Sequence, residues 1–253
     1  PDGPADLRAT ALWGACWLAF HQDDLVAARR YSEQLLRVTS DDETSLRRRN
    51  ALTAQAMLRM AEGDFTAALI PLERSAAITD RGEVSWYMAT SKLNLALDLL
   101  HLGRLDRASS LLAEARELYA RLGDRRFEAR VYAYQGHLEL LRGEIQRASD
   151  LFCRSAHRFD ELGDQSGVAE ALEGLSAVAA AGGAMDRAAV LLGAARHARE
   201  RSMSKILPFE RALIERWLDE AQQHLGEKRW SDLLEQGSAT DVHVVLDMPR
   251  RNQ

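Results

Sequence analysis

The strongest constraint on the fold is a pattern that recurs every 40 residues, in five segments starting at residues 23, 63, 103, 143 and 183. Five positions after each start stands an alanine, namely Ala28, Ala68, Ala108, Ala148 and Ala188. Seven positions before each start stands a small residue, namely Cys16, Ala56, Ala96, Gly136 and Ser176. A fixed internal period of this size indicates a repeat protein, in which each unit buries its apolar face against its neighbours.

Each copy predicts a pair of antiparallel helices. The glycine that starts most copies can end one helix in the left-handed conformation, and the apolar-x-x-Ala-x-x-apolar spacing then begins a second. Two helices approach closely only where small side chains lie at their crossing, and the two small-residue columns provide this. First helices are expected at about 5–20, 45–61, 84–101, 126–141 and 166–181. Second helices are expected at about 24–38, 64–79, 104–121, 144–161 and 184–201, with a kink at Pro71.

The predicted fold class is therefore all-α: a right-handed α-solenoid of five helical hairpins, followed by capping helices at the C-terminal end. The array spans residues 1–202, the capping helices 203–237, and residues 238–253 form a tail that is either a short helix or disordered. Apolar residues at steps of four predict one amphipathic helix over 208–225, ended by Gly226 and followed by a short helix. We interpret Trp217 and Trp230 as core residues of this cap rather than as binding residues.

Composition narrows the function. Acidic residues outnumber basic ones 38 to 33, for a net charge of −5, so this segment is not expected to bind nucleic acid directly. No apolar stretch is long enough for a membrane helix, and no signal peptide opens the chain. With two cysteines, the expected location is cytoplasmic. Because no HExxH, GxSxG, CxxC or GxxxxGK[ST] motif occurs, we expect no enzyme activity, no cofactor and no metal site.

The pattern small–(x6)–Gly–(x)–apolar–(x2)–Ala resembles that of tetratricopeptide repeats (TPR). The segments LGDRRFEARVYAYQGHLELLRGEIQRASDLF and LLGAARHARERSMSKILPFERALIERWLDEAQQHLGEKRWSDLLEQG are similar to C-terminal sensor regions of bacterial STAND-type ATPase regulators. That group includes the large ATP-binding LuxR-type and AfsR-like transcriptional regulators. The resemblance covers about residues 5–237 and implies a sensor module within a larger protein, because the ATPase phosphate loop and a helix-turn-helix do not occur in this sequence.

In TPR arrays the first helix of each hairpin lines a concave face, and the resemblance implies that ligands contact repeated positions on it. In this chain those positions select Trp13, Trp17, Asn50, Thr53, Met57, Thr90, Leu97, Arg130 and His137 as candidate binding residues. The tryptophan end suits an apolar ligand or the apolar side of a partner helix, and Arg130 with His137 suits an anion. Farther along, the same positions are acidic, at Glu170 and Glu173.

Structural roles remain open for the same residues. Trp13 and Trp17 can instead pack on an upstream hairpin, since Pro1 looks like a cut within a longer polypeptide, and Met57 and Leu97 can belong to the core. Arg130 can form a salt bridge with Glu170, one period away. The leading functional hypothesis is a non-catalytic regulatory domain that binds a protein, a peptide or a small-molecule inducer. The alternative is a scaffold for protein assembly or self-association.

Overall fold

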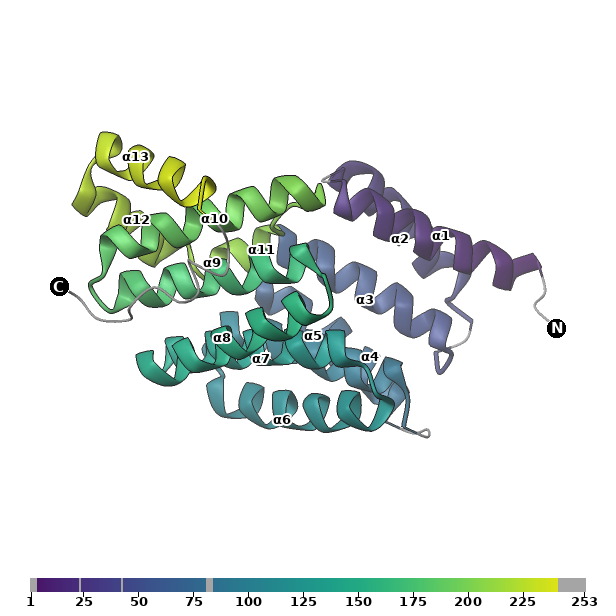
Figure 1. Cartoon of the computed structure of the whole chain (residues 1–253). Coiled ribbons are helices and arrows are strands. Elements are labelled where there is room, and N and C mark those ends of the chain that lie inside the picture. Colours follow the sequence, from purple (N-terminus) through teal and green to yellow (C-terminus); the bar gives the residue numbers. More distant parts are fainter. Residues whose placement is uncertain (1–3, 23, 42, 81–83, 241–253) are drawn as a thin grey trace. The chain divides into compact units, whose positions relative to one another are not determined.

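The computed structural model describes residues 4–22, 24–41, 43–80 and 84–240 (Figure 1). Every regular element in these ranges is an α-helix, as the 40-residue pattern predicts. The first helices of the hairpins are α1 (Pro4–His21), α3 (Leu46–Ala61), α5 (Trp86–His101), α7 (Arg125–Leu141) and α9 (Gln165–Ala181). The second helices are α2 (Leu25–Val38), α4 (Phe65–Thr79), α6 (Leu105–Leu122), α8 (Ile145–Glu161) and α10 (Met185–Ser202). All ten expected helices are therefore present.

Contacts divide the chain into two units. Unit 1 contains the described residues up to Leu122 together with Leu207–Phe209, and unit 2 contains Gly123–Ile206 and the described residues from Glu210 onward. Unit 1 holds the hairpins α1/α2, α3/α4 and α5/α6, and unit 2 holds α7/α8 and α9/α10 with the part of the cap from Glu210 onward. The sequence-based division into array, cap and tail stays a prediction.

The two small-residue columns meet inside the hairpins, as expected. The five alanines of the second helices have no exposed side-chain surface. In unit 1 the Cys16 thiol donates to the carbonyl of Ala28 at 3.4 Å, and in unit 2 the Ser176 hydroxyl donates to the carbonyl of Ala188 at 2.7 Å. A small side chain on one helix thus touches the backbone of the other, which is the close approach that the pattern predicted.

The helix boundaries follow from local capping chemistry. The glycines at the ends of four first helices, Gly63, Gly103, Gly143 and Gly183, have φ between 68° and 81°, a conformation that other residues adopt only under strain. Asp24, Asp64, Asp124 and Asp164 each accept a hydrogen bond from the backbone N–H three residues on, at the start of the following helix. Helix α4 continues without a break through the buried Pro71, so the predicted kink there stays a prediction.

The cap differs from the prediction in one respect. In place of one helix over 208–225, the chain forms α11 (Pro208–Ala212) and α12 (Glu215–Leu225). Leu213 and Ile214 lie between them and both are buried, with backbone N–H groups bonded to carbonyls three residues earlier. This tighter turn, bonded over three residues, separates α11 from α12.

The end of the cap confirms the expectation. Gly226 ends α12 at a φ of 73°, and α13 (Glu227–Ser238) follows. Trp217 and Trp230 are buried, so they are core residues. α13 crosses α10 at two glycines: a Cβ on Gly193 or Gly237 would lie about 2 Å from the other helix's backbone carbonyl oxygen. The predicted tail from residue 241 onward lies outside the described residues.

The segment after α10 also completes unit 1. Phe209 is buried and its ring stacks on Phe20 of α1, with centroids 6.0 Å apart. His101, at the end of α5, forms a hydrogen bond with the Phe209 backbone and stacks on Phe65 at 3.8 Å. Burial lowers the pKa of His101 to about 4, so this imidazole is neutral at physiological pH. Among the described helices, none has the length and apolar character that crossing a bilayer demands.

Candidate functional site

The tryptophan end of the predicted binding face lies on α1 in unit 1. Trp13 is half-buried against a small core of Ala9, Leu12, Leu35 and Ala51 from the first two hairpins. Trp17 has 43% of its surface exposed, and its ring lies 5.8 Å from that of Trp13 and 4.5 Å from that of His21. Leu18 beside it is exposed as well. This helix therefore presents apolar surface that a partner can cover.

Three predicted polar residues of unit 1 belong to its interior hydrogen bonding. The Thr53 hydroxyl bonds that of Ser75 at 3.0 Å, and the Thr90 hydroxyl bonds that of Tyr119 at 3.0 Å. Asn50 is half-buried and accepts a hydrogen bond from Arg49 at 2.9 Å. Leu97 is buried in the core, and Met57 is half-buried. The predicted residues of unit 1 that keep exposed surface are Trp13, Trp17, Asn50 and Met57.

Arg49, which the sequence analysis did not single out, joins this network through Ser91, whose hydroxyl lies 3.4 Å from that of Ser75. It is 1% exposed, donates to the Ser91 hydroxyl at 3.1 Å and lies over the Tyr87 ring. One of its terminal nitrogens has no hydrogen-bond partner in the described residues, and burial lowers its pKa to about 10. The equivalent positions in the other four repeats are alanines, Ala9, Ala89, Ala129 and Ala169. An arginine at a position that is alanine in the other repeats was the sequence signal that could have identified Arg49.

In unit 2, the predicted basic and acidic residues pair with one another. Arg130 donates to Glu170 at 3.2 Å, and this carboxylate raises the pKa of the guanidinium, so the predicted salt bridge is present. His137 is buried with its ring edge-on to Phe152 at 4.9 Å. Glu173 accepts two hydrogen bonds from Arg199, at 3.0 Å and 2.8 Å.

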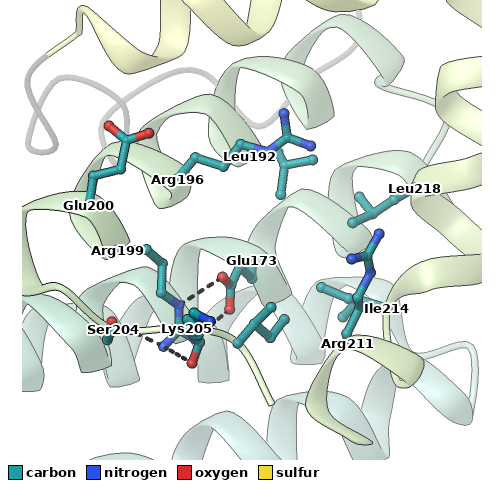
Figure 2. Close-up of a pocket in the computed structure, with 11 residues that line it drawn as sticks. Glu173, Leu192, Arg196, Arg199, Glu200, Ser204, Lys205, Arg211, Ile214 and Leu218 are labelled. Atoms are coloured by element: carbon teal, nitrogen blue, oxygen red, sulfur yellow. Dashed lines mark hydrogen bonds and ion pairs between the residues drawn. The ribbon is translucent and has the colours of Figure 1, made fainter. Parts of the chain in front are cut away.

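A cavity of about 440 Å³ opens beside this last pair, between α10, the segment that follows it and α12 (Figure 2). Four cationic side chains and two carboxylates line it, together with Leu192, Ile206, Ile214 and Leu218; the charged residues are Arg196, Arg199, Lys205, Arg211, Glu173 and Glu200. Its volume falls in the range of small-molecule and peptide-side-chain pockets. Sequence reasoning found Glu173 here but missed the rest, because the cavity is formed by the packing of the cap.

The Arg199–Glu173 pair fixes one wall of this cavity. Both side chains are largely buried. Burial alone would lower the pKa of Arg199, but the hydrogen bonds with Glu173 outweigh it and raise that pKa. The remaining nitrogen of Arg199 donates to the hydroxyls of Ser166 and Ser204 and to the Lys205 carbonyl. All three nitrogens of this guanidinium thus donate hydrogen bonds within unit 2.

The described residues hold no cluster of His, Cys, Asp and Glu side chains with metal-binding geometry. A tetratricopeptide repeat family model matches residues 87–160. No curated protein matches the chain.

Solved structures resemble this one at low sequence identity. A Rap protein complexed with Competence and Sporulation Factor is 17% identical, with a TM-score of 0.64 over 95% of this chain and 74% of that one. BtubC from P. vanneervenii is 20% identical, with a TM-score of 0.52 over 81% of this chain and 94% of that one. A putative kinesin light chain of Podosopora anserina with TPR-like repeats is 18% identical, with a TM-score of 0.51 over 77% of this chain and 92% of that one. The chain thus has a TPR-like fold of helical hairpins, with the family match extending over α5 to α8.

Proposed function

We propose that this chain is a non-catalytic binding domain that receives a protein, peptide or small-molecule signal for a larger bacterial regulator. The observation that carries the proposal is the exposed apolar surface of α1, where Trp17 is 43% exposed beside Trp13. Tryptophan is enriched among the residues that dominate binding energy at protein interfaces. The TPR-like fold supports the same class of function, and the similar Rap protein was solved in complex with a factor.

The contact residues of the proposal are the predicted ones with exposed surface: Trp13, Trp17, Asn50 and Met57. Thr53, Thr90 and Leu97 position those helices through buried contacts. In unit 2, Arg130 keeps partial exposure while it is held by Glu170, and His137 is buried. The regulatory context rests on the sequence resemblance to STAND-type sensor regions. Sequencing the natural reading frame tests it, because a regulator of that type should also encode a GxxxxGK[ST] phosphate loop.

Affinity capture from a bacterial extract, followed by reconstitution with the purified partner, tests the binding surface. We expect Trp17→Ala to weaken the reconstituted complex about tenfold or more, as loss of a buried aromatic anchor does. Trp86→Ala is the matched control, because Trp86 is similarly exposed but lies at the start of α5, and it should retain affinity. Equal binding by wild type and Trp17→Ala would contradict the proposal.

Self-association is the second candidate function, and the exposure of Leu18 favours it. Leu18 is 58% exposed, whereas the residues one, three and four periods later, Leu58, Leu138 and Val178, are buried. The first hairpin therefore leaves exposed a helix face whose equivalents in these later repeats are buried.

A further inference from the structure

The cavity beside α10 in unit 2 has a charge that its own residues do not neutralise. Glu173 is held by Arg199. Arg211 pairs with Glu215 at 3.3 Å in an exposed i,i+4 contact, which is worth little and is easily exchanged. Arg196 forms no hydrogen bond or ion pair with any described residue. Two guanidinium groups at this cavity are thus available to a ligand.

Apolar side chains line the cavity next to these two guanidinium groups, which are themselves exposed. Figure 2 shows the Arg196 guanidinium beside Leu192 and the Arg211 guanidinium beside Ile214 and Leu218, while the Glu200 carboxylate points away from Arg196. Guanidinium groups bind carboxylates by paired, charge-assisted hydrogen bonds. A ligand that matches the cavity therefore carries an anionic group and an aliphatic group next to each other.

We propose that this cavity binds a carboxylate attached to an apolar group, supplied by an acidic segment of a partner peptide. The carboxylate lies between Arg196 and Arg211, and the aliphatic part covers Ile206 and Leu218, which keep part of their surface exposed. The Arg199–Glu173 pair acts as a wall, because two hydrogen bonds hold its side chains to each other. This inference rests on the proposed binding function and adds the chemical class of partner and a second contact site.

Fluorescence anisotropy with the full chain tests this inference. The probe is a labelled eight-residue peptide of alternating leucine and glutamate, and the reference is the same peptide with glutamine in place of glutamate. We expect the glutamate peptide to bind about tenfold more tightly, the effect of one charge-assisted contact. A carboxylate next to an apolar group can come from a peptide or from a small molecule, and octanoate represents the small molecule. If the site binds a peptide, octanoate should bind there more weakly than the glutamate peptide does.

Charge-reversal variants locate the site. Arg196→Glu should raise the dissociation constant of the glutamate peptide about tenfold or more, and Arg211→Glu should also raise it. Arg201→Glu is the matched control, since Arg201 is exposed on the same helix but does not line the cavity. It should change the constant less than about twofold. Circular dichroism checks that each variant folds, as expected for exposed side chains.

Several outcomes overturn the inference. They are equal binding of the two peptides, no binding of the glutamate peptide at about 1 mM, tighter binding of octanoate than of peptide, and equal weakening by Arg201→Glu and Arg196→Glu. The proposed binding function is judged separately by Trp17→Ala in unit 1. A partner complex that is sensitive to Trp17 but not to Arg196 would keep that function and remove this site.

Discussion

Asp98 is a charged residue in a position that the other repeats fill with aliphatic side chains. The equivalent residues are Leu18, Leu58, Leu138 and Val178. Asp98 has no exposed surface, and neither oxygen of its carboxylate has a hydrogen-bond partner among the described residues. Burial raises the pKa of Asp98 to about 7, with Arg104 opposing and Glu73 adding to this shift. Unit 1 therefore carries a carboxyl group that is more stable in its protonated form.

This arrangement predicts that stability falls as pH rises. In the unfolded chain Asp98 loses its proton near its ordinary pKa of 3.8, and in the folded chain near 7. Between these values the folded state binds a proton that the unfolded state lacks, so the free energy of unfolding decreases with pH and levels off above about 7.

Urea unfolding of wild type and Asp98→Asn at about pH 5 and about pH 8 measures this effect. We expect the stability of the variant relative to wild type to increase by at least about 1 kcal/mol over that range. Asp232→Asn removes an exposed carboxylate on α13 and serves as control. A difference between wild type and Asp98→Asn that does not change with pH would contradict the prediction.

At the scale of elements, α7, α8 and α9 pack around the ring of Phe152. This ring has no exposed surface, and a Cβ on Gly136 of α7 would lie 2.8 Å from it. A Cβ on Gly174 of α9 would lie 2.1 Å from the same ring. The two glycines thus let both first helices approach a large side chain of the second helix between them.

Gly174→Ala should therefore destabilise unit 2 by roughly 1–3 kcal/mol through overpacking. Phe152→Leu should relieve the clash, so a double-mutant cycle read by urea unfolding should give a favourable coupling of about 1 kcal/mol or more. Gly14→Ala is the control, because Gly14 is also within a helix but has no atom within 4 Å of an added Cβ. It should be neutral or stabilising by up to about 1 kcal/mol. Additive effects in the cycle would refute this description of the packing.

Most of this element structure could be predicted from the sequence. The two small-residue columns and the glycine helix ends specify local geometry, and they placed the ten repeat helices correctly. The break between α11 and α12 was not predictable from spacing, because the apolar steps of four residues continue from Phe209 through Leu213 to Trp217 across it. The crossing of α10 and α13 at Gly193 and Gly237 was missed too, since neither glycine belongs to a repeated column.

The candidate site was harder to predict for the same reason. Repeat register identifies which residues share a helix face, but it does not say which of them neighbouring helices cover. Trp17 remained exposed, whereas Thr53 and Thr90 are enclosed by hydrogen-bond partners from second helices. The cavity lined by Arg196 and Arg211 depends on the irregular cap, and no periodic signal leads to it.

At the scale of the whole molecule, the exposed face of α1 predicts self-association. Leu7, Ala11, Gly14 and Leu18 form an exposed stripe at helical spacing, with small residues at its centre. Antiparallel pairing with a second copy would place Leu7 against the partner's Leu18 and Ala11 against its Gly14. Such an interface is self-complementary, as a twofold dimer requires.

Sedimentation over a range of concentrations measures this. We expect a concentration-dependent dimer for wild type and a monomer for Leu18→Glu, because a buried unpaired carboxylate opposes the interface. Leu162→Glu, at a similarly exposed leucine after α8, should dimerise like wild type. A wild-type chain that stays monomeric at about 1 mM would eliminate this assembly.

Repeat proteins usually tolerate the gain or loss of repeats, because each repeat contacts only its neighbours. This chain departs from that rule at Phe209, which follows the last hairpin yet stacks on Phe20 of the first. Recombination that replaced the first hairpin would remove Phe20 and leave the Phe209 ring without its stacking partner. Evolutionary shuffling of these repeats is therefore restricted, and the two phenylalanines should be inherited together.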